Sequence, residues 1–183
     1  MDASAVQTPF QREVEIVMLL ASQTHRYNGR PGDGPDPAIG RELHHEIEVR
    51  AGLGIVGDRY FAEAAHQRFS VTVMAAESLE RLAEQLQLPE VPHAAPTRRN
   101  IILRGADVDS LRGVTFSLDS GDGPVLLLGT TPANPCAWMN EMIAPGAHQA
   151  LRGHGGMRCE PLGSGWLRLG AAVLRSSAPI GPA

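Results

Sequence analysis

The sequence contains no lysine, and all 16 of its basic residues are arginine. Enzymes that hold pyridoxal phosphate as a Schiff base need a lysine amine for that bond. The absence therefore excludes a lysine-anchored pyridoxal phosphate cofactor. A basic surplus of the kind typical of nucleic-acid-binding proteins is also missing, since the formal net charge is -4, and we expect no nucleic-acid partner.

Cysteines are few, and long apolar runs are lacking. Cys136 and Cys159 are the two cysteines of the chain, which are too few for a disulfide scaffold. No apolar run approaches the roughly 20 residues that cross a bilayer, and the first residues show no charged-then-apolar signal pattern. We therefore expect a cytoplasmic protein with free thiols and no membrane association.

The composition is typical of one folded domain. Of the 183 residues, 43% are hydrophobic and 20% are charged, which is enough for a core without disulfide or metal staples. We expect a flexible leader at residues 1–12, a single domain at residues 13–176 and a flexible tail at residues 177–183.

Short β-branched runs between glycine-rich turns predict a mainly β protein, a closed or nearly closed β-barrel with a few peripheral helices. The expected strands are residues 14–21, 43–49, 67–74, 100–103, 114–118, 125–128, 157–162, 166–169 and 172–174. A helix is expected at residues 76–86, where Leu79, Leu82 and Leu86 share one face. The glycine- and proline-rich stretch 25–40 is expected to be a long loop that borders a functional site.

Gly52, Gly54 and Gly57 have the spacing of a dinucleotide-binding loop. The strand expected before them alternates polar and apolar residues, whereas a central parallel strand is almost wholly apolar. No crossover helix of adequate length follows them. We therefore interpret the glycines as a turn, after which Asp58 and Arg59 place two charged groups beside a pocket.

Histidines near residue 45 suggest a metal site at first sight. Adjacent residues of a strand point to opposite faces, so His44 and His45 cannot share an ion, whereas His44 and Glu46 can. No HxxxH or CxxC pair completes a zinc site. A solvated strand face is the better interpretation.

Cys136 is the strongest candidate for a chemical role. It follows Asn134 and Pro135 at the start of an expected short helix, residues 137–143. Unpaired N–H groups and the positive end of the helix dipole favour the thiolate form at such a position. The alternative is a small buried apolar residue, which is how most free cysteines behave and how we interpret Cys159 in its strand.

Arg98, Arg99 and Asn100 stand at the entrance of an expected strand. Two guanidinium groups and an amide in this position can bind phosphate or carboxylate, or can form an exposed loop corner. His154 lies in a glycine-rich loop, which allows a ligand role without establishing one.

Taken in order along the chain, these pieces resemble the MOSC domain, which is named for the C-terminal domain of molybdenum-cofactor sulfurases. The resemblance covers roughly residues 40–175, and it is the ordered set of motifs that is specific. The matching segments are residues 52–60, 98–105, 111–113, 134–136, 151–158 and 165–170.

The resemblance implies a β-barrel whose family cysteine, matched by Cys136, ligates molybdenum in a molybdopterin cofactor or handles sulfur. Segments 57–59 and 98–100 are then expected to meet in one cleft. The residues expected to bind the phosphate and pterin of the cofactor are Arg59, Arg98, Arg99, Asn100, Asp58 and His154.

Two functions stay open on this resemblance. The first is a molybdenum-dependent oxidoreductase that reduces N-hydroxylated or N-oxygenated compounds, with Cys136 as metal ligand and a separate protein as electron donor. The second is a non-enzymatic sulfur carrier or cofactor-binding module, which uses a Cys136 persulfide and takes its sulfur from a separate donor protein.

Overall fold

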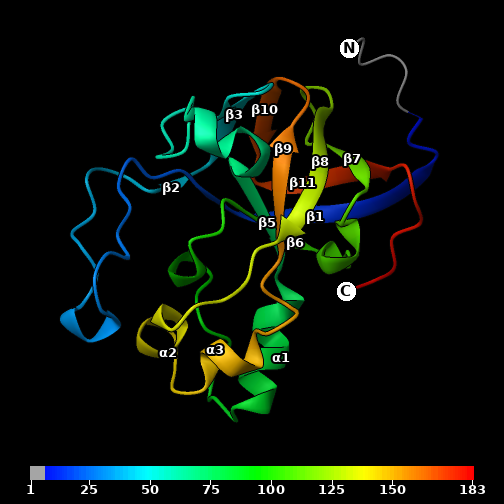
Figure 1. The fold of residues 1–183 in the computed structure, drawn as a ribbon. Coiled ribbons are helices and arrows are strands. Elements are labelled where there is room, and N and C mark those ends of the chain that lie inside the picture. Colours follow the sequence, from blue (N-terminus) through cyan, green and yellow to red (C-terminus); the bar gives the residue numbers. More distant parts are fainter. Residues whose placement is uncertain (1–6) are drawn as a thin grey trace.

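Within residues 7–183, the part of the chain that the computed structural model describes, seven strands close into a barrel (Figure 1). These strands are β1 (Phe10–Leu20), β5 (Val71–Ala75), β6 (Ile101–Arg104), β7 (Thr115–Asp119), β8 (Val125–Pro132), β9 (Met157–Pro161) and β11 (Gly170–Ser176). Their order around the barrel is β1, β11, β7, β8, β9, β5 and β6, and β6 pairs with β1 to complete the closure. The predicted mainly β barrel is therefore confirmed.

A smaller sheet shares the core of the barrel. Its strands are β3 (Glu46–Arg50), β4 (Gly54–Ile55) and β10 (Gly165–Arg168), while β2 (Leu43–His44) pairs antiparallel with the end of β1. The glycine motif lies here, because β3 and β4 form an antiparallel hairpin in which Gly52, Gly54 and Gly57 have positive φ angles. An antiparallel hairpin is the predicted turn and differs from the βαβ unit of a dinucleotide-binding fold.

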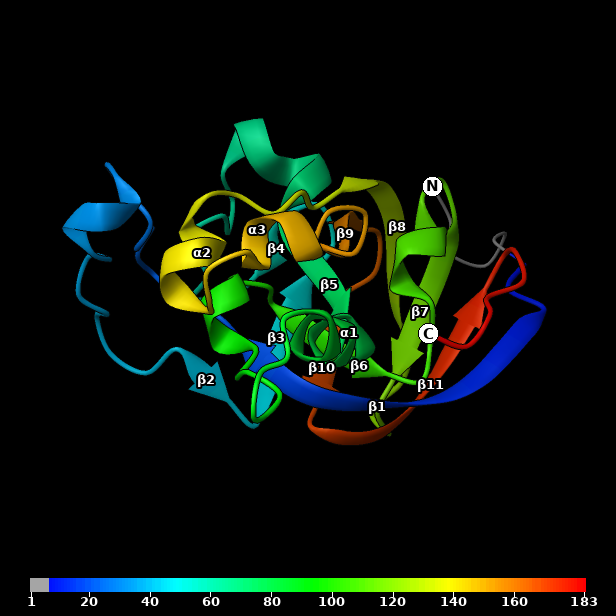
Figure 2. The same cartoon turned by 90° about the horizontal axis from the view of Figure 1, so that it is seen from below.

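The three α-helices described gather at one end of the barrel, below it in Figure 1 and facing the viewer in Figure 2. The α-helices are α1 (Glu77–Gln85), α2 (Trp138–Met142) and α3 (Ala147–Ala150), and the 3-10 helices are η2 (Pro31–Asp33), η3 (Ala64–Phe69), η4 (Ala95–Thr97) and η5 (Val108–Leu111). None of the helices found in residues 7–183 combines the length and the apolar character that a membrane crossing requires.

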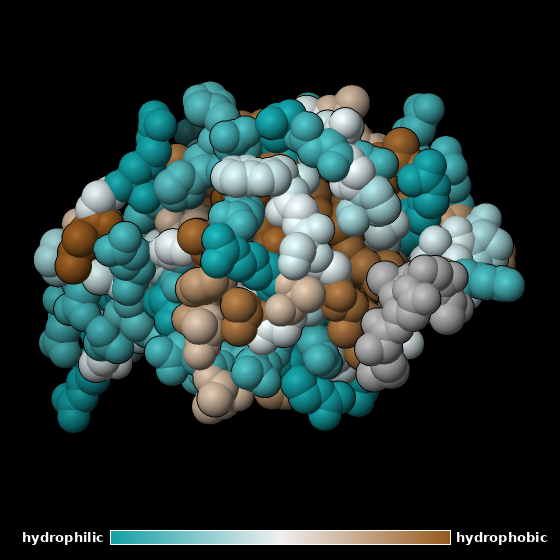
Figure 3. All heavy atoms as spheres, turned by 90° about the horizontal axis from the view of Figure 1, so that it is seen from above, coloured by the Kyte–Doolittle hydropathy of each residue, from teal (hydrophilic) through white to brown (hydrophobic). Residues whose placement is uncertain are grey.

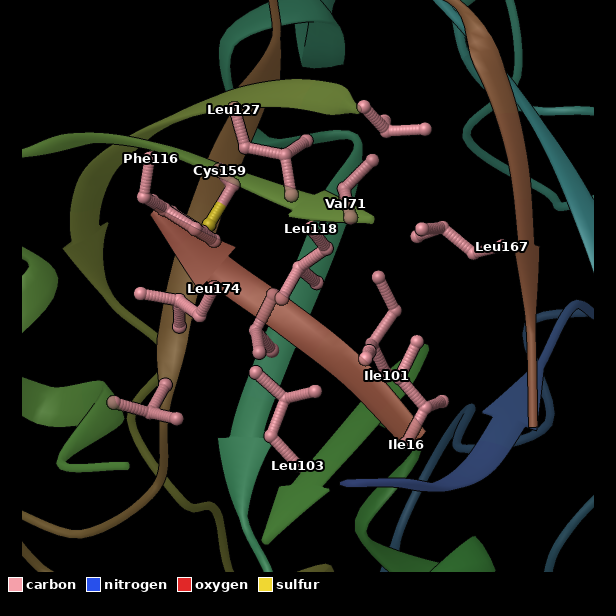
Figure 4. Close-up of a cluster of buried hydrophobic side chains, with 14 of the residues drawn as sticks. Ile16, Val71, Ile101, Leu103, Phe116, Leu118, Leu127, Cys159, Leu167 and Leu174 are labelled. Atoms are coloured by element: carbon pink, nitrogen blue, oxygen red, sulfur yellow. The ribbon is translucent and has the colours of Figure 1, made fainter. Parts of the chain in front are cut away.

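Alternate side chains of the strands fill the barrel, as the period of two along a strand requires. Figure 4 shows Ile16, Phe116, Leu127 and Leu174, from four different strands, within one buried cluster. Cys159 of β9 lies among them, and its complete burial raises the pKa of its thiol far above the usual range. Cys159 is thus a small buried core residue.

A second apolar cluster joins the helices to the outside of the barrel. Leu79 and Leu82 of α1 are buried against Met74 and Ile102, and Leu86 packs at the margin of the same cluster. The helix lies within one residue of the expected bounds at each end, and its leucine face packs on the barrel.

The ends of the domain differ from the boundaries expected from the sequence. Residues 10–12 belong to β1 and pair with β11, so they are not part of a leader, while residues 1–6 lie outside the described part of the chain. In the expected tail, the Ser177 amide donates to the Thr115 carbonyl (2.8 Å), and the Gly181 carbonyl accepts from the Asp107 amide (3.1 Å). These contacts tie the last residues to the barrel.

The surface seen from above the barrel mixes hydrophilic and hydrophobic residues (Figure 3). Large hydrophobic side chains that stay exposed are spread over several strands and loops and are Phe10, Val17, Ile39, Leu43, Val91, Leu162, Trp166 and Leu169. Scattered exposure of this kind is normal for a folded domain. The most distinctive chemistry of the molecule lies instead in a cavity.

Candidate functional site

A cavity of about 370 Å³ surrounds Cys136, where α2 meets the loop after β1 and the segment before β6. Its volume falls in the range of small-molecule sites, about 300–1,000 Å³. The residues that line it are His25, Arg26, Tyr27, Arg59, Tyr60, Thr97, Arg98, Arg99, Asn134, Pro135, Cys136, Trp138, Met139 and Arg158. The long loop predicted to border a site does so through its first three residues.

Cys136 is exposed in the turn between β8 and α2. The expected helix after it is present but short, since α2 has only five residues and Ala137 is its N-cap. A helix of this length contributes little dipole, so the helix end is not the main source of positive potential at the thiol. That potential comes from arginine side chains.

Five arginines line the cavity, and no carboxylate does. Glu42, behind the wall, is shared by Arg98 (Nη2 to Oε1, 2.9 Å) and Arg26 (Nη1 to Oε2, 3.2 Å). Asp58 lies 3.5 Å from Nη1 of Arg59. Two carboxylates against five guanidinium groups leave three positive charges uncompensated by side chains in the described residues. The cavity is built to attract an anion.

The side chain of Arg99 donates its hydrogen bonds to backbone carbonyls. Its Nε donates to the Gly155 carbonyl (2.8 Å), and its Nη2 donates to the carbonyls of Ala133 (2.5 Å) and Asn134 (3.3 Å). Burial, with a further contribution from the nearby charge of Arg158, lowers the pKa of Arg99 to about 10. Arg99 therefore clamps the segment before Cys136, and its charge is left without a carboxylate partner.

Asp58 and Asn100 form a buried scaffold behind the cavity and do not line it. Asp58 Oδ2 accepts from the Ser22 amide (3.2 Å) and from Asn100 Nδ2 (3.2 Å), and Asp58 Oδ1 accepts from the Tyr60 amide (3.1 Å). Asn100 Oδ1 accepts from both the amide and the hydroxyl of Thr72. These bonds bring segments 57–59 and 98–100 together, as the resemblance implies, but they make Asp58 and Asn100 supports rather than ligand-facing groups.

Arg98 has a strained backbone, and Arg59 holds buried donors without hydrogen-bond acceptors. Arg98 has a left-handed backbone (φ 59°), and its side chain is 9% exposed. Its Nη2 lies 2.9 Å from Oε1 of Glu42 and is engaged in that ion pair. Neither Nε nor Nη1 of Arg59 has a hydrogen-bond partner within the described residues. Strained backbone and unsatisfied donors are characteristic of ligand sites.

Aromatic side chains form the other walls. Tyr27 stacks on Trp138 with ring centroids 4.7 Å apart, and its hydroxyl donates to the Pro96 carbonyl (2.6 Å). Partial burial raises the pKa of Tyr27 to about 12. Across the cavity, the Arg59 guanidinium lies 4.6 Å above the ring of Tyr60. A planar group could be bound between such surfaces.

A second hollow, of about 350 Å³, adjoins the first and shares five residues with it: Arg59, Tyr60, Arg98, Arg99 and Arg158. His66 and Phe69 of η3 belong to this second hollow alone, and the His66 ring stacks on Tyr60 (4.5 Å). Because the arginines separate the two hollows, an anion in either one meets the same positive charges.

His154 does not join the cavity, contrary to the role expected for it. Its Nδ1 lies 3.3 Å from Oδ2 of Asp109 and 3.5 Å from Nη2 of Arg81. The glycine loop that carries it passes behind the clamp of Arg99, so His154 faces a different surface. In the described residues, no group of three or more His, Cys, Asp and Glu side chains could hold a metal ion, and His44 Nε2 lies 3.1 Å from the Ala21 carbonyl.

Several cavity residues were not identified from the sequence. Tyr27, Trp138 and Arg26 carry no motif of their own, and only the folded chain brings them to Cys136. Arg158 is the last residue of segment 151–158, which resembles part of the MOSC pattern. That segment is the sequence feature from which Arg158 could have been predicted.

Solved structures of other proteins have the same fold. The YuaD protein from Bacillus subtilis matches with a TM-score of 0.70 and 17% identity, over 93% of this chain and 99% of that chain. YiiM from Escherichia coli matches with a TM-score of 0.58 and 16% identity, over 93% of this chain and 72% of that chain. YiiM from Geobacillus stearothermophilus matches with a TM-score of 0.56 and 15% identity, over 93% of this chain and 75% of that chain.

YuaD and YiiM therefore share the barrel fold of this chain. At identities of 15–17% the likeness shows the fold alone. No family model matches the sequence, and no curated protein does.

Proposed function

We propose that this chain is a MOSC-type protein that binds a molybdenum cofactor, with Cys136 as the protein ligand of the metal. The observation that carries the proposal is an exposed thiol inside a cavity with three uncompensated positive charges. A molybdopterin cofactor carries phosphate, and a thiolate is the soft ligand that suits a sulfur-bound molybdenum. The barrel shared with YuaD and YiiM supports the proposal.

The donors present fit such a group. The unsatisfied donors of Arg59, together with the unpaired charge of Arg158, would hold the phosphate. The Tyr27–Trp138 stack, which lines the cavity, would flank the pterin. When bound, the cofactor supplies two electrons, which together with two protons convert an N-hydroxyl group to N–H and water.

The chain itself has three tasks in this function. The arginines bind the anionic group and neutralise its charge. The clamp of Arg99 on the Ala133 and Asn134 carbonyls fixes the backbone that presents Cys136. The Tyr27–Trp138 stack forms one aromatic wall of the cavity. Together these groups orient a substrate next to the thiol-bound metal.

A sulfur-carrier function is the second candidate, and the accessibility of Cys136 favours it. A persulfide at Cys136 would carry a negative charge on its outer sulfur, and the surrounding arginines would stabilise that charge. This function needs no turnover by the chain, only a donor and an acceptor of sulfur.

The test compares Cys136→Ser with Cys159→Ser in protein produced in cells that make the cofactor. Cys136→Ser is expected to lose molybdenum, because a hydroxyl is a poor ligand for a thiophilic metal, and to keep its fold. Cys159→Ser should keep the metal but lose stability by about 1–3 kcal/mol, because it buries a hydroxyl in an apolar core.

Metal content, persulfide content and circular dichroism are measured on both variants and the parent. Molybdenum together with reduction of an N-hydroxylated compound supports the first function. Persulfide without molybdenum supports the second. If Cys136→Ser retains the parental load of both, neither function holds.

A further inference from the structure

Asp109 and His154 form a polar cluster that the proposed function leaves unused. Asp109 lies in η5, and neither residue lines the cavity. Oδ1 of Asp109 accepts from the Gly156 amide (3.1 Å), while Oδ2 lies 3.3 Å from Nδ1 of His154. Partial burial of Asp109 raises the pKa of its carboxyl group. The carboxylate is therefore held at a desolvation cost.

The peptide that Asp109 holds is also bonded to Arg99 and to the segment before Cys136. The Gly156 carbonyl accepts from the Ala133 amide (2.8 Å), and the Gly155 carbonyl accepts from Nε of Arg99 (2.8 Å). A Cβ atom on Gly155 would lie 2.3 Å from the Ala133 carbonyl oxygen, and one on Gly156 would lie 2.2 Å from that of Val73. Residues 155 and 156 must both be glycine, because the backbone of Ala133 contacts the first and the backbone of Val73 contacts the second, with no room for a side chain.

From this peptide a continuous chain of contacts runs to the thiol. Arg99, held by Gly155, donates in turn to the carbonyls of Ala133 and Asn134. Asn134 stands two positions before Cys136, and Arg99, whose charge has no carboxylate partner, lines the same cavity as the thiol. Whatever fixes Gly155 and Gly156 therefore fixes both the charge and the backbone of the site.

We propose that Asp109 is a positioning residue of the Cys136 site, acting through the Gly155–Gly156 peptide on Arg99 and on the segment that carries the thiol. The proposal rests on the proposed function only in taking Cys136 as the working residue. His154 assists by holding the second carboxylate oxygen, which leaves the first oxygen aimed at the Gly156 amide.

The test uses the thiol itself as a reporter and needs no cofactor. Cys136 is alkylated with iodoacetate, an anion, and with iodoacetamide, its neutral counterpart, and the two rates are compared by mass spectrometry. Their ratio measures the positive potential at the thiol and is insensitive to a general change in exposure. Arg99→Gln should lower this ratio about three- to tenfold, because one nearby charge is lost.

Asp109→Ala should lower the ratio by a similar factor, because Arg99 loses its fixed anchor. Removing a negative charge without moving Arg99 would raise the ratio instead, so the sign separates positioning from a charge effect at a distance. Asp109→Asn should show a ratio equal to or above that of the parent, because the amide oxygen of the asparagine still accepts from the Gly156 amide. The double variant of Asp109→Ala with Arg99→Gln should fall no further than either single variant.

The matched control is Asp119→Ala. Asp119 Oδ1 accepts from the Gly121 amide (2.9 Å), the same kind of contact, at a site away from the cavity. Its ratio should equal that of the parent. If Asp109→Ala fails to fold, Asp109→Glu replaces it, since the longer side chain keeps the charge but displaces the carboxylate and should also lower the ratio.

A ratio at or above the parental value in Asp109→Ala and Asp109→Glu overturns the proposal, as does an equal fall in Asp109→Asn. Molybdenum and persulfide contents of the same variants are measured separately. Their absence in the parent would count against the proposed function alone, because alkylation does not depend on either.

Discussion

Arg158 is the cavity arginine that the rest of the protein uses least. It lies on β9 and lines both hollows, yet its guanidinium makes no hydrogen bond or ion pair with any other side chain or backbone group of residues 7–183. Arg99, by contrast, holds four backbone carbonyls. Two neighbouring arginines can thus be separated into one that is free for a ligand and one that maintains the site.

Arg158→Gln should therefore weaken retention of the anionic cofactor without loss of stability. A charge-assisted contact is worth about 1.5–3 kcal/mol, which corresponds to roughly tenfold to hundredfold weaker binding. The change in the free energy of unfolding should stay within about 0.5 kcal/mol. Cofactor content after gel filtration and urea unfolding measure the two effects.

Arg99→Gln serves as the contrast to this variant and should lose both retention and stability. Unchanged cofactor retention in Arg158→Gln would show that this arginine does not contact the ligand.

Elements with a strong local pattern could be predicted from the sequence. The helix α1 was found because three leucines repeat at helical spacing, and most strands were found from their β-branched runs. The first four residues of β1 do not follow from the sequence, because Gln11, Arg12 and Glu13 are polar and become part of a strand only by pairing with β11. Residues 67–69, expected in a strand, form part of the 3-10 helix η3 instead.

The candidate site divides in the same way. The meeting of segments 57–59 and 98–100 followed from the resemblance, since both segments belong to its ordered motifs. The sequence does not predict the different roles of Arg98, Arg99 and Asn100. These residues are adjacent and chemically similar, and only their contacts in the folded chain distinguish them. The displacement of His154 to Asp109 likewise depends on a contact across 45 positions.

The strand β8 and the 3-10 helix η5 are in direct backbone contact at Gly129. A Cβ atom on Gly129 of β8 would lie 2.0 Å from the carbonyl oxygen of Leu111, the last residue of η5. Gly129→Ala must therefore push η5 away from the barrel, and we expect a loss of stability of about 1–3 kcal/mol. Urea unfolding measures it.

The control for this variant is Gly32→Ala in η2, where nothing lies within 4 Å of the added Cβ. It should change stability by less than about 0.5 kcal/mol. Equal stabilities for the two variants would mean that η5 is not packed on β8 as closely as described. Because η5 also carries Asp109, the Gly129 variant should disturb the Cys136 site as well.

For the molecule as a whole, the lack of lysine simplifies its behaviour in alkali. No lysine amine titrates near pH 10, so the effect of the buried Cys159 thiol and of the Tyr27 phenol on stability can be measured without that overlap. Both have raised pKa values in the folded protein, from 9.0 for Cys159 and from 10.0 to about 12 for Tyr27. The unfolded chain therefore releases these protons first, and stability falls as pH rises.

We expect the free energy of unfolding to fall from about pH 9 upward, by at most about 1.4 kcal/mol per pH unit for the Cys159 proton. Cys159→Ala should remove this early part of the slope. Cys136→Ala should keep it, because the buried thiol stays in place. Arg99, whose pKa is lowered from 12.5 to about 10, acts in the opposite direction, so the measurement is confined to pH 8–10.

Urea unfolding at half-unit intervals of pH provides the data. A parental slope that survives in Cys159→Ala would mean that the thiol is not the buried group responsible.

The stack of Tyr27 on Trp138 has a practical consequence for following this protein in solution. The chain has two tryptophans: Trp138 is buried at the cavity wall, whereas Trp166 is 43% exposed on β10. Their emission spectra should differ, since a buried indole fluoresces at shorter wavelength than a hydrated one. With Trp166 replaced by Phe, the remaining fluorescence comes from the indole beside Cys136, and its quenching would report the arrival of a chromophoric ligand directly.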